Sequence, residues 1–249
     1  MIATDIDAER FFLARQRVLS EANKHSGIGT LAEKALHSIL KYYFEPSDEF
    51  HEVKYKGAVA DIKRGNSIVE IQSASLKRLS GKLDKFLPEC SVEVVYPLAA
   101  EKRIHVIDRE SGEISAPRKS PKIGSPCDVF DELWGLEKFL FRDGFSIVLV
   151  FVDVDEYRYA APKGKYRPRA TVRAERIPTR IREIITLSDK SDYAALIPQE
   201  LAEAFTVKEL AALIHRKPRY AQGMITALMR MGILKKVGER GRAYLYSRT

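Results

Sequence analysis

The stretch Ala58-Val-Ala-Asp61-Ile-Lys-Arg-Gly-Asn-Ser-Ile-Val-Glu70-Ile-Gln72 decides how the first part of the chain folds. Two β-rich runs flank a central Gly-Asn dipeptide, which favours a two-residue hairpin turn. With that turn, Arg64 faces Ser67. Counting outward then places Asp61 opposite Glu70. Because two carboxylates paired across a ladder repel each other, the pattern favours a divalent cation between them, and oxygen ligands indicate Mg²⁺ or Mn²⁺.

The segments around this hairpin have a definite order. Hydrophobic periodicity and turn residues predict helices over residues 7–23, 31–44, 76–87 and 128–141, and strands over residues 51–56, 59–64, 67–72, 92–97 and 145–159. Trp134, which sits at helical spacing with its neighbours, is expected to face the core. Helix, three strands, helix and strand indicate an α/β fold with a partly antiparallel sheet.

An Asp, a hairpin and then Glu-x-Gln, set in this order of elements, resemble the core of the PD-(D/E)XK nuclease superfamily over residues 29–97. The resemblance implies a restriction-endonuclease-like mixed sheet flanked by helices, and hydrolysis of DNA phosphodiester bonds with Mg²⁺ or Mn²⁺ as cofactor. It further implies that the carboxylates of Asp61 and Glu70 and the carbonyl of Ile71 hold the metal.

Three more residues take catalytic roles by the same resemblance. Glu33 on the preceding helix is the accessory acid, although Thr30-Leu-Ala-Glu33 fits a capping box equally well. Gln72 stands where lysine is commoner, and an amide can only orient the attacking water by hydrogen bonding. Lys82 on the following helix can supply the missing positive charge. His37, one turn beyond Glu33, is expected to be a polar-face or partly buried histidine rather than a ligand.

Two alternatives compete with this site. Asp61 and Glu70 can be solvated strand residues that hold no ligand. Asp153, Asp155 and Glu156 form a second acidic cluster at the end of a strand. Because no third element accompanies this second cluster, we expect it to be a solvated edge.

Residues 198–249 carry the second informative pattern. A short helix ending near Phe205, a helix opened by the capping box Thr206–Glu209, a helix over 218–231 and two strands around a glycine-containing turn resemble a winged helix-turn-helix. The helix over 218–231 suits the major groove of DNA, where Gly223 would permit close approach of the backbone. The residues expected to contact DNA are Arg219, Gln222, Thr226, Arg230, Arg240 and Arg242.

The charge distribution favours the same partner. The chain has 42 Lys and Arg against 34 Asp and Glu, a net charge of +8. Residues 206–249 hold ten basic and two acidic residues, and residues 163–182 hold eight basic residues and one acidic residue. Two basic blocks on an acidic body favour a polyanion, most simply double-stranded DNA, and we expect the block over 163–182 to neutralise phosphates beside the site.

Several classes of protein are excluded by composition. Cys90 and Cys127 lack the spacing of a disulfide framework or a zinc ribbon. The acidic N-terminus and the short apolar runs argue against a signal peptide and a membrane span. We therefore expect a cytoplasmic protein with no membrane partner, for which a homodimer stays open.

The sequence predicts two domains, a nuclease-like domain over residues 1–192 that ends in a polar linker over 186–192, and a winged helix-turn-helix domain over residues 193–249. The preferred function is a metal-dependent DNA endonuclease targeted by the winged helix. The main alternative is a non-enzymatic DNA-binding regulator on a degenerate nuclease fold. A third reading is an interaction module whose winged helix binds another protein.

Overall fold

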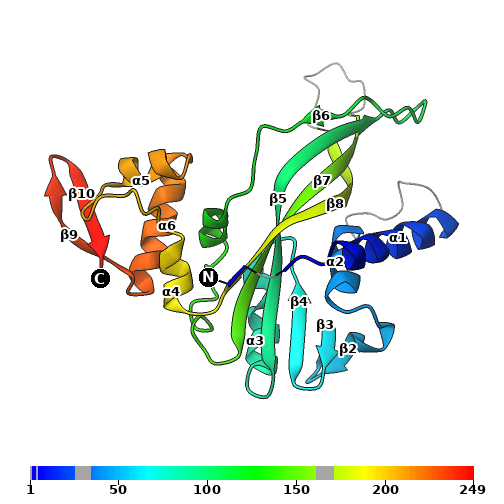
Figure 1. Ribbon diagram of the computed structural model, residues 1–249, viewed down its shortest axis with the longest axis horizontal. Helices are drawn as coiled ribbons and strands as arrows, with labels where there is room; N and C mark the ends of the chain where they lie inside the picture. The colour runs from blue at the N-terminus through cyan, green and yellow to red at the C-terminus, as the bar shows by residue number, and fades with distance from the viewer. Residues whose placement is uncertain (1, 4, 26–34, 161–170) are drawn as a thin grey trace.

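The structure is a computed structural model that describes residues 2–3, 5–25, 35–160 and 171–249 (Figure 1). Its helices are α1 (Ala8–His25), α2 (Ala35–Phe44), α3 (Ser80–Phe86), α4 (Lys190–Ala195), α5 (Val207–Leu213) and α6 (Pro218–Arg230), with 3-10 turns η1 (Asp48–Phe50), η2 (Leu76–Leu79) and η3 (Pro126–Asp131). Its strands are β1 (Ile2–Ala3), β2 (His51–Tyr55), β3 (Ala58–Arg64), β4 (Ser67–Ile71), β5 (Ser91–Ile107), β6 (Arg118–Lys119), β7 (Phe145–Tyr159), β8 (Val172–Leu187), β9 (Leu234–Arg240) and β10 (Ala243–Arg248).

One mixed sheet organises the body of the protein. Within the described residues its strands run in the order β1-β8-β7-β5-β4-β3-β2, and β6 pairs with β5. Strands β2, β3 and β4 form an antiparallel meander, β4, β5 and β7 are mutually parallel, and β8 and β1 return antiparallel. The prediction of an α/β fold with a partly antiparallel sheet is therefore confirmed.

Helices cover both faces of this sheet. Helices α1 and α2 pack on one face, where Leu40 and Ile39 meet sheet residues such as Ile71 and Val95 in one buried cluster. On the other face α3, η3 and the C-terminal helices form a second buried cluster with sheet residues such as Val94. Figure 1 shows α1 and α2 at one side of the sheet and α4, α5 and α6 at the other. Alternation along each strand supplies both faces, because successive side chains point to opposite sides.

The C-terminal region consists of α4, α5, α6 and the β9–β10 hairpin. Thr206 caps α5, and its capping box with Glu209 is present as predicted. Pro218 opens α6, and Gly232 follows the helix with a φ of 69°, the left-handed conformation that glycine adopts at helix ends. The backbone of Phe205 pairs with Tyr246 of β10 and so ties the start of this region to its hairpin.

Two predictions at the start of the C-terminal region are wrong. The polar linker over 186–192 is instead the end of β8 and the start of α4, because Asp189 and Asp192 form a capping box rather than a loop. The short helix ending near Phe205 is absent from residues 198–205, because the backbone of Phe205 is used in pairing with Tyr246. The polar residues after β8 therefore cap a helix instead of forming a linker. The first helix of the C-terminal region is α4, which ends before residue 198.

The helix predicted over residues 128–141 is also wrong. The chain forms the short 3-10 turn η3 and then a series of turns, and Gly135 has a φ of 85°. A positive φ cannot belong to a right-handed helix, so the helical spacing seen in the sequence does not apply beyond that point. Trp134 is 44% exposed rather than in the core, and the guanidinium carbon of Arg230 lies 4.1 Å from the centroid of its ring.

Candidate functional site

The β3–β4 hairpin has the register that its turn predicts. Arg64 pairs with Ser67, and the ladder continues to Ile62 opposite Val69. Beyond this pair a side chain joins the two strands. Oδ2 of Asp61 accepts a hydrogen bond of 2.8 Å from the backbone N–H of Ile71. The N–H of Asp61 in turn donates to Oε1 of Glu70 over 3.4 Å. Each carboxylate therefore accepts a hydrogen bond from the backbone of the other strand at the point where the two strands separate.

Glu70 is a buried carboxylate with one cationic partner. Only 1% of the residue is exposed, and Nζ of Lys82, on α3, lies 2.7 Å from its Oε2. Burial and then the negative charge of Asp61 raise the pKa of Glu70 to about 7, and the hydrogen bond from Lys82 opposes this rise. The structure thus places Lys82 beside Glu70, where the sequence expected an added positive charge.

The raised pKa of Glu70 makes the stability of the metal-free protein depend on pH. A carboxyl group whose folded pKa lies above its unfolded value stabilises the fold at low pH, and this contribution is lost as pH rises through the folded value, here about 7. Between about pH 5 and pH 8 in chelator, we expect the unfolding free energy of the wild type to fall by about 2 to 3 kcal/mol relative to Glu70→Gln. Denaturant titrations of both proteins at several pH values measure this difference, and a constant difference would contradict the raised pKa.

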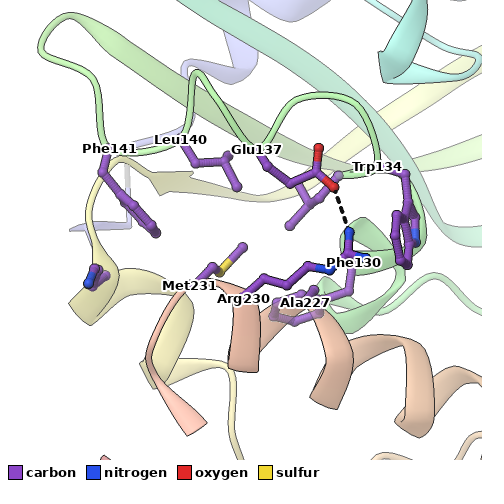
Figure 2. Close-up of a pocket in the computed structure, with 10 residues that line it drawn as sticks. Phe130, Trp134, Glu137, Leu140, Phe141, Ala227, Arg230 and Met231 are labelled. Carbon is purple, nitrogen blue, oxygen red and sulfur yellow. Dashed lines mark hydrogen bonds and ion pairs between the residues drawn. The ribbon is translucent and has the colours of Figure 1, made fainter.

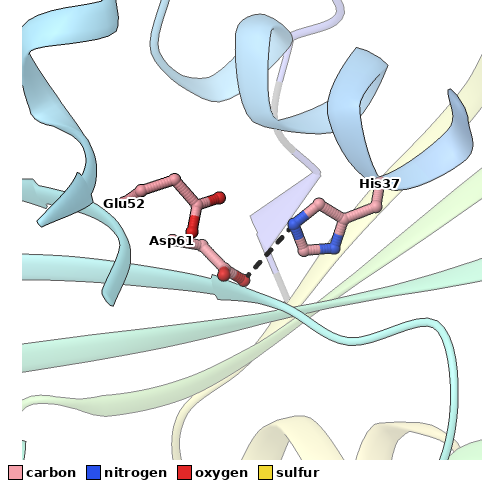
Figure 3. Close-up of side chains that lie close together, drawn as sticks. All are labelled: His37, Glu52 and Asp61. Atoms are coloured by element: carbon pink, nitrogen blue, oxygen red, sulfur yellow. Dashed lines mark ion pairs between the residues drawn. The ribbon is translucent and has the colours of Figure 1, made fainter. Parts of the chain in front are cut away.

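His37 and Glu52 are two residues of the site that sequence reasoning missed. Nε2 of His37, on α2, lies 3.7 Å from Oδ2 of Asp61. One ligand atom from each of His37, Glu52 and Asp61 lies within 4.8 Å of the other two (Figure 3). Burial lowers the pKa of His37, although Asp61 opposes this, and the lowered pKa favours the neutral imidazole, which can offer a lone pair. The expectation of a partly buried histidine is confirmed, and its ring faces the carboxylate of Asp61.

Glu52 was detectable from strand register. The β2–β3 pairs His51 with Ile62 and Val53 with Ala60 bracket a position where Glu52 faces Asp61. Its backbone has a φ of 51°, in the left-handed region that residues other than glycine rarely adopt. Its carboxylate forms an ion pair with Lys41 of α2. Strained backbone in a cluster of polar side chains is a common feature of binding sites.

Of the remaining predicted site residues, the structure describes Gln72 and Ile71 but not Glu33. Oε1 of Gln72 accepts a hydrogen bond of 3.3 Å from the N–H of Ala74, so its amide is engaged with the chain just beyond β4. Glu33 and the capping box with Thr30 lie outside the described residues. Ile71 donates its N–H to Asp61, and a hydrogen bond between its backbone and His37 raises the pKa of the imidazole. Ile71, whose carbonyl is the predicted metal ligand, therefore follows Glu70 in the chain and contacts both Asp61 and His37 through its backbone.

Helix α6 has three faces, and only one of them is free for a ligand. Buried residues such as Met224 and Leu228 pack inside the C-terminal region. A second face packs on η3, where a Cβ added to Gly223 would lie 3.1 Å from Oδ1 of Asp131, so this glycine permits approach of the protein body rather than of DNA. The free face carries three predicted DNA-binding residues, Arg219, Gln222 and Thr226, of which the last two hydrogen bond to each other.

Arg230 lies on the same exposed side of α6 as Arg219, but at the end of the helix that meets the turns after η3. Its guanidinium lies over Trp134, and its Nη1 is 3.1 Å from Oε1 of Glu137 (Figure 2). These residues border a pocket of about 220 Å³ between α6 and the turns after η3. Because its charge is already paired with Glu137, we expect Arg230 to contribute less to DNA binding than the other predicted residues of α6.

The two arginines of the β9–β10 hairpin differ in the same way. Nη1 of Arg240 lies 2.7 Å from Oε1 of Glu209, so its charge is partly neutralised within the C-terminal region. Arg242 is exposed and follows Gly241, which has a φ of 63° at the turn. The exposed turn therefore presents Arg242 more openly than Arg240.

The described part of the second basic block is mostly strand, and two of its arginines form ion pairs with acidic residues. Residues 163–170 lie outside the described residues, and β8 holds the rest of the block. Arg182 hydrogen bonds to Asp153 over 2.7 Å, and Arg173 lies 3.8 Å from the fully buried Glu156. The expectation that the acidic cluster of β7 is a solvated edge is wrong for Glu156, because cations on β5, β7 and β8 surround its carboxylate.

A cleft of about 580 Å³ separates the start of α6 from strands β5, β7 and β8. Its lining combines Tyr96 and Tyr220 with charged residues of both signs, among them the cations Lys122, Lys217 and Arg219 and the acids Asp128, Asp131, Glu132 and Glu156. Tyr96 follows directly on β5 from Val95, which pairs with Ile71 of β4. The cleft therefore begins on the strand next to the carboxyl end of β4 and extends to the free face of α6.

The fold and these contacts define a mixed α/β protein with a cluster of carboxylates, a lysine and a histidine at the edge of the β3–β4 hairpin. The chain belongs to the family described as "Domain of unknown function (DUF8091)", whose model matches residues 34–188. It is also 31% identical over 223 residues to an uncharacterized protein of Treponema pallidum (strain Nichols), a match that covers 88% of this chain and 86% of that protein. No solved structure matches the chain. Among the described residues, no helix is both long and apolar enough to cross a membrane.

Proposed function

We propose that the protein is a metal-dependent DNA endonuclease of the PD-(D/E)XK type. The observation that carries the proposal is the pairing of the partly buried Asp61 with the buried Glu70, whose carboxylate has Lys82 at 2.7 Å. The order α2, β2, β3, β4, α3 and β5 supports it, because this is the order of elements expected for that superfamily. The family match over residues 34–188 spans all of these elements.

The donor set at Asp61 and Glu70 fits a hard divalent cation. Burial, and after it the negative charge of Asp61, raise the pKa of Glu70 to about 7, and a bound cation would oppose both effects. Asp61, Glu70 and the carbonyl of Ile71 would hold Mg²⁺ or Mn²⁺ through oxygen atoms. When bound there, such an ion polarises a phosphate and lowers the pKa of a bound water.

Lys82 takes the role that a motif lysine would have on β4. Its ammonium group lies beside Glu70, at the place where a phosphate and its attacking water would meet the carboxylates. A point charge there stabilises the negative charge that develops on the phosphate during transfer. Gln72, whose amide oxygen is bound to the N–H of Ala74, would first have to release that bond to orient a water.

DNA would reach this site through the cleft beside α6. The lining of the cleft includes Lys122, Lys217 and Arg219, which suit phosphate oxygens, and two tyrosines that suit bases. The free face of α6, with Gln222 and Thr226, then adds contacts to base edges of a duplex, as in a winged helix-turn-helix. The C-terminal region would thus position the substrate that the sheet cuts.

The proposal is tested by offering single- and double-stranded DNA to the wild type with Mg²⁺ or Mn²⁺. We expect divalent-dependent cleavage that falls at least about tenfold in Lys82→Gln, because one charge-stabilising group is removed. Adding Gln72→Lys to that variant restores the commoner motif and should recover part of the loss. Lys85→Gln, on the same helix but bound to the carbonyl of Gly57, is the matched control and should cleave normally.

A non-enzymatic DNA-binding regulator is the second candidate. Its support is the ion pair between Lys82 and Glu70, which partly neutralises a carboxylate that a metal would need, together with the engaged amide of Gln72. Binding of DNA without cleavage of any substrate under either metal would favour this second candidate.

A further inference from the structure

A second cluster of ligand atoms includes Asp61 but not Glu70. It consists of the imidazole of His37 from α2, the carboxylate of Glu52 from β2 and the carboxylate of Asp61 from β3. The three ligand atoms lie within 4.8 Å of one another, a separation that one cation can span, and Figure 3 shows His37 and Glu52 converging on Asp61 from two different elements. Three elements that follow one another along the chain, α2, β2 and β3, therefore present their ligand atoms to one point.

The local structure holds Glu52 in this position at a cost. A left-handed φ of 51° in a glutamate within a strand is unfavourable, and residues held in such backbone conformations gather at ligand sites. Lys41 forms an ion pair with Glu52, and its side chain is only 12% exposed. The carboxylate of Glu52 thus already binds one cationic group, the ammonium of Lys41. A metal ion would neutralise the same carboxylate and would also bind His37 and Asp61.

The chemistry of the ligand atoms differs from that at Asp61 and Glu70. An imidazole nitrogen is a ligand that first-row transition metals accept readily, whereas Mg²⁺ prefers oxygen ligands alone. Mn²⁺ accepts both kinds of ligand. The mixed set of one nitrogen and two carboxylates therefore selects a transition-metal ion over Mg²⁺.

We propose that His37, Glu52 and Asp61 form a second divalent-metal site with a preference for a transition-metal ion such as Mn²⁺. Asp61 would belong both to this site and to the site with Glu70, one carboxylate serving two ions as in two-metal phosphodiesterases. That sharing rests on the proposed function, but binding at His37 and Glu52 does not. The first site would then accept Mg²⁺ or Mn²⁺, and the second would distinguish between them.

Mn²⁺ titrations of the full chain, followed by electron paramagnetic resonance of the free ion, test the proposal. We expect two bound Mn²⁺ in the wild type, one in His37→Ala, one in Glu70→Gln and none in Asp61→Asn. Glu52→Gln should weaken the second site at least about tenfold. In wild type, excess Mg²⁺ should displace one Mn²⁺ more easily than the other.

Two further variants make the outcome specific to this cluster. His105→Ala removes a histidine that lies 3.5 Å from Asp155 elsewhere on the sheet, and it should bind Mn²⁺ like the wild type. Lys41→Met removes the cation paired with Glu52 and should strengthen Mn²⁺ binding, the direction opposite to that of Glu52→Gln. Circular dichroism of each variant checks that the fold is kept.

The outcomes separate this proposal from the proposed nuclease. If His37→Ala and His105→Ala bind Mn²⁺ alike, the second site is overturned, whatever the cleavage assays show. If the wild type binds one Mn²⁺ that His37→Ala loses and Glu70→Gln keeps, the second site stands and the metal site of the proposed nuclease fails.

Discussion

Asp61→Asn and Glu70→Gln are expected to abolish divalent-dependent cleavage of DNA, with losses of at least about 100-fold each. Both variants keep the shape of the side chain and remove its negative charge, so the oxygen ligands that the metal needs are weakened. Asp61→Asn also changes the acceptor of the 2.8 Å hydrogen bond from Ile71, but an amide oxygen can still accept it. The loss is therefore expected in activity and not in folding.

Thermal unfolding supplies a second measurement for the same two variants. A ligand that binds only the native state stabilises it by mass action, by about 2.7 kcal/mol when the free ion is at 100 times its Kd. Millimolar Mg²⁺ should therefore raise the Tm of the wild type, and each variant should lose most of this rise. If the wild type gains no stability from Mg²⁺ or Mn²⁺ and cuts no DNA, the nuclease proposal is wrong.

Replacing Arg219 and Arg242 by Gln together should lower the affinity for duplex DNA at least roughly tenfold. Both side chains are exposed, one on the free face of α6 and one at the turn of the β9–β10 hairpin. Each lost phosphate contact should reduce the slope of log affinity against log salt by about one, so the double variant should show a slope smaller by about two. Fluorescence anisotropy over a range of salt concentrations measures both quantities.

Arg230→Gln is the matched control for this measurement. The wild-type side chain is also on α6 and about half exposed, but it is paired with Glu137 and lies over Trp134 of the body. Its replacement should leave the affinity and the salt dependence nearly unchanged. Equal losses in the control and in the double variant would place the DNA interface elsewhere.

Point variants are needed here because the C-terminal region cannot be removed cleanly. Its residues Leu228 and Phe205 belong to the same buried cluster as Phe130 and Leu187 of the body. Deleting residues 194–249 would expose that cluster to water and destabilise the sheet. A loss of DNA binding after such a deletion would therefore report unfolding as well as lost contacts.

The β3–β4 hairpin and its register were predictable because they are set by local chemistry. A Gly-Asn turn allows one tight connection, and strand alternation then assigns each side chain to a face. The pairing of Arg64 with Ser67 and the meeting of Asp61 with Glu70 follow from counting along the chain. Capping boxes are equally local, which is why the one at Thr206 was predicted correctly.

Other features required the tertiary structure because they join elements that are distant in the sequence. His37 comes to Asp61 only through the packing of α2 on the sheet, and its spacing on a helix gives no sign of that partner. Arg230 has the same charge as Arg219 and lies on the same helix, yet the packing of α6 against the turns after η3 pairs it with Glu137. The spacing of apolar residues predicted a helix over 128–141, but Gly135 has a positive φ that ends any helix there. Such a φ cannot be read from the spacing of apolar residues.

The sequence by itself thus determined the order of elements, the facing carboxylates and the basic C-terminal helix, since each depends on residues close along the chain. Only the tertiary structure decided which charges remain available to a ligand. It placed Lys82 on Glu70, His37 and Glu52 beside Asp61, and the arginines of β8 on the acids of β7. The reason is that the availability of a charge depends on its neighbours in space, and packing of distant segments chooses those neighbours.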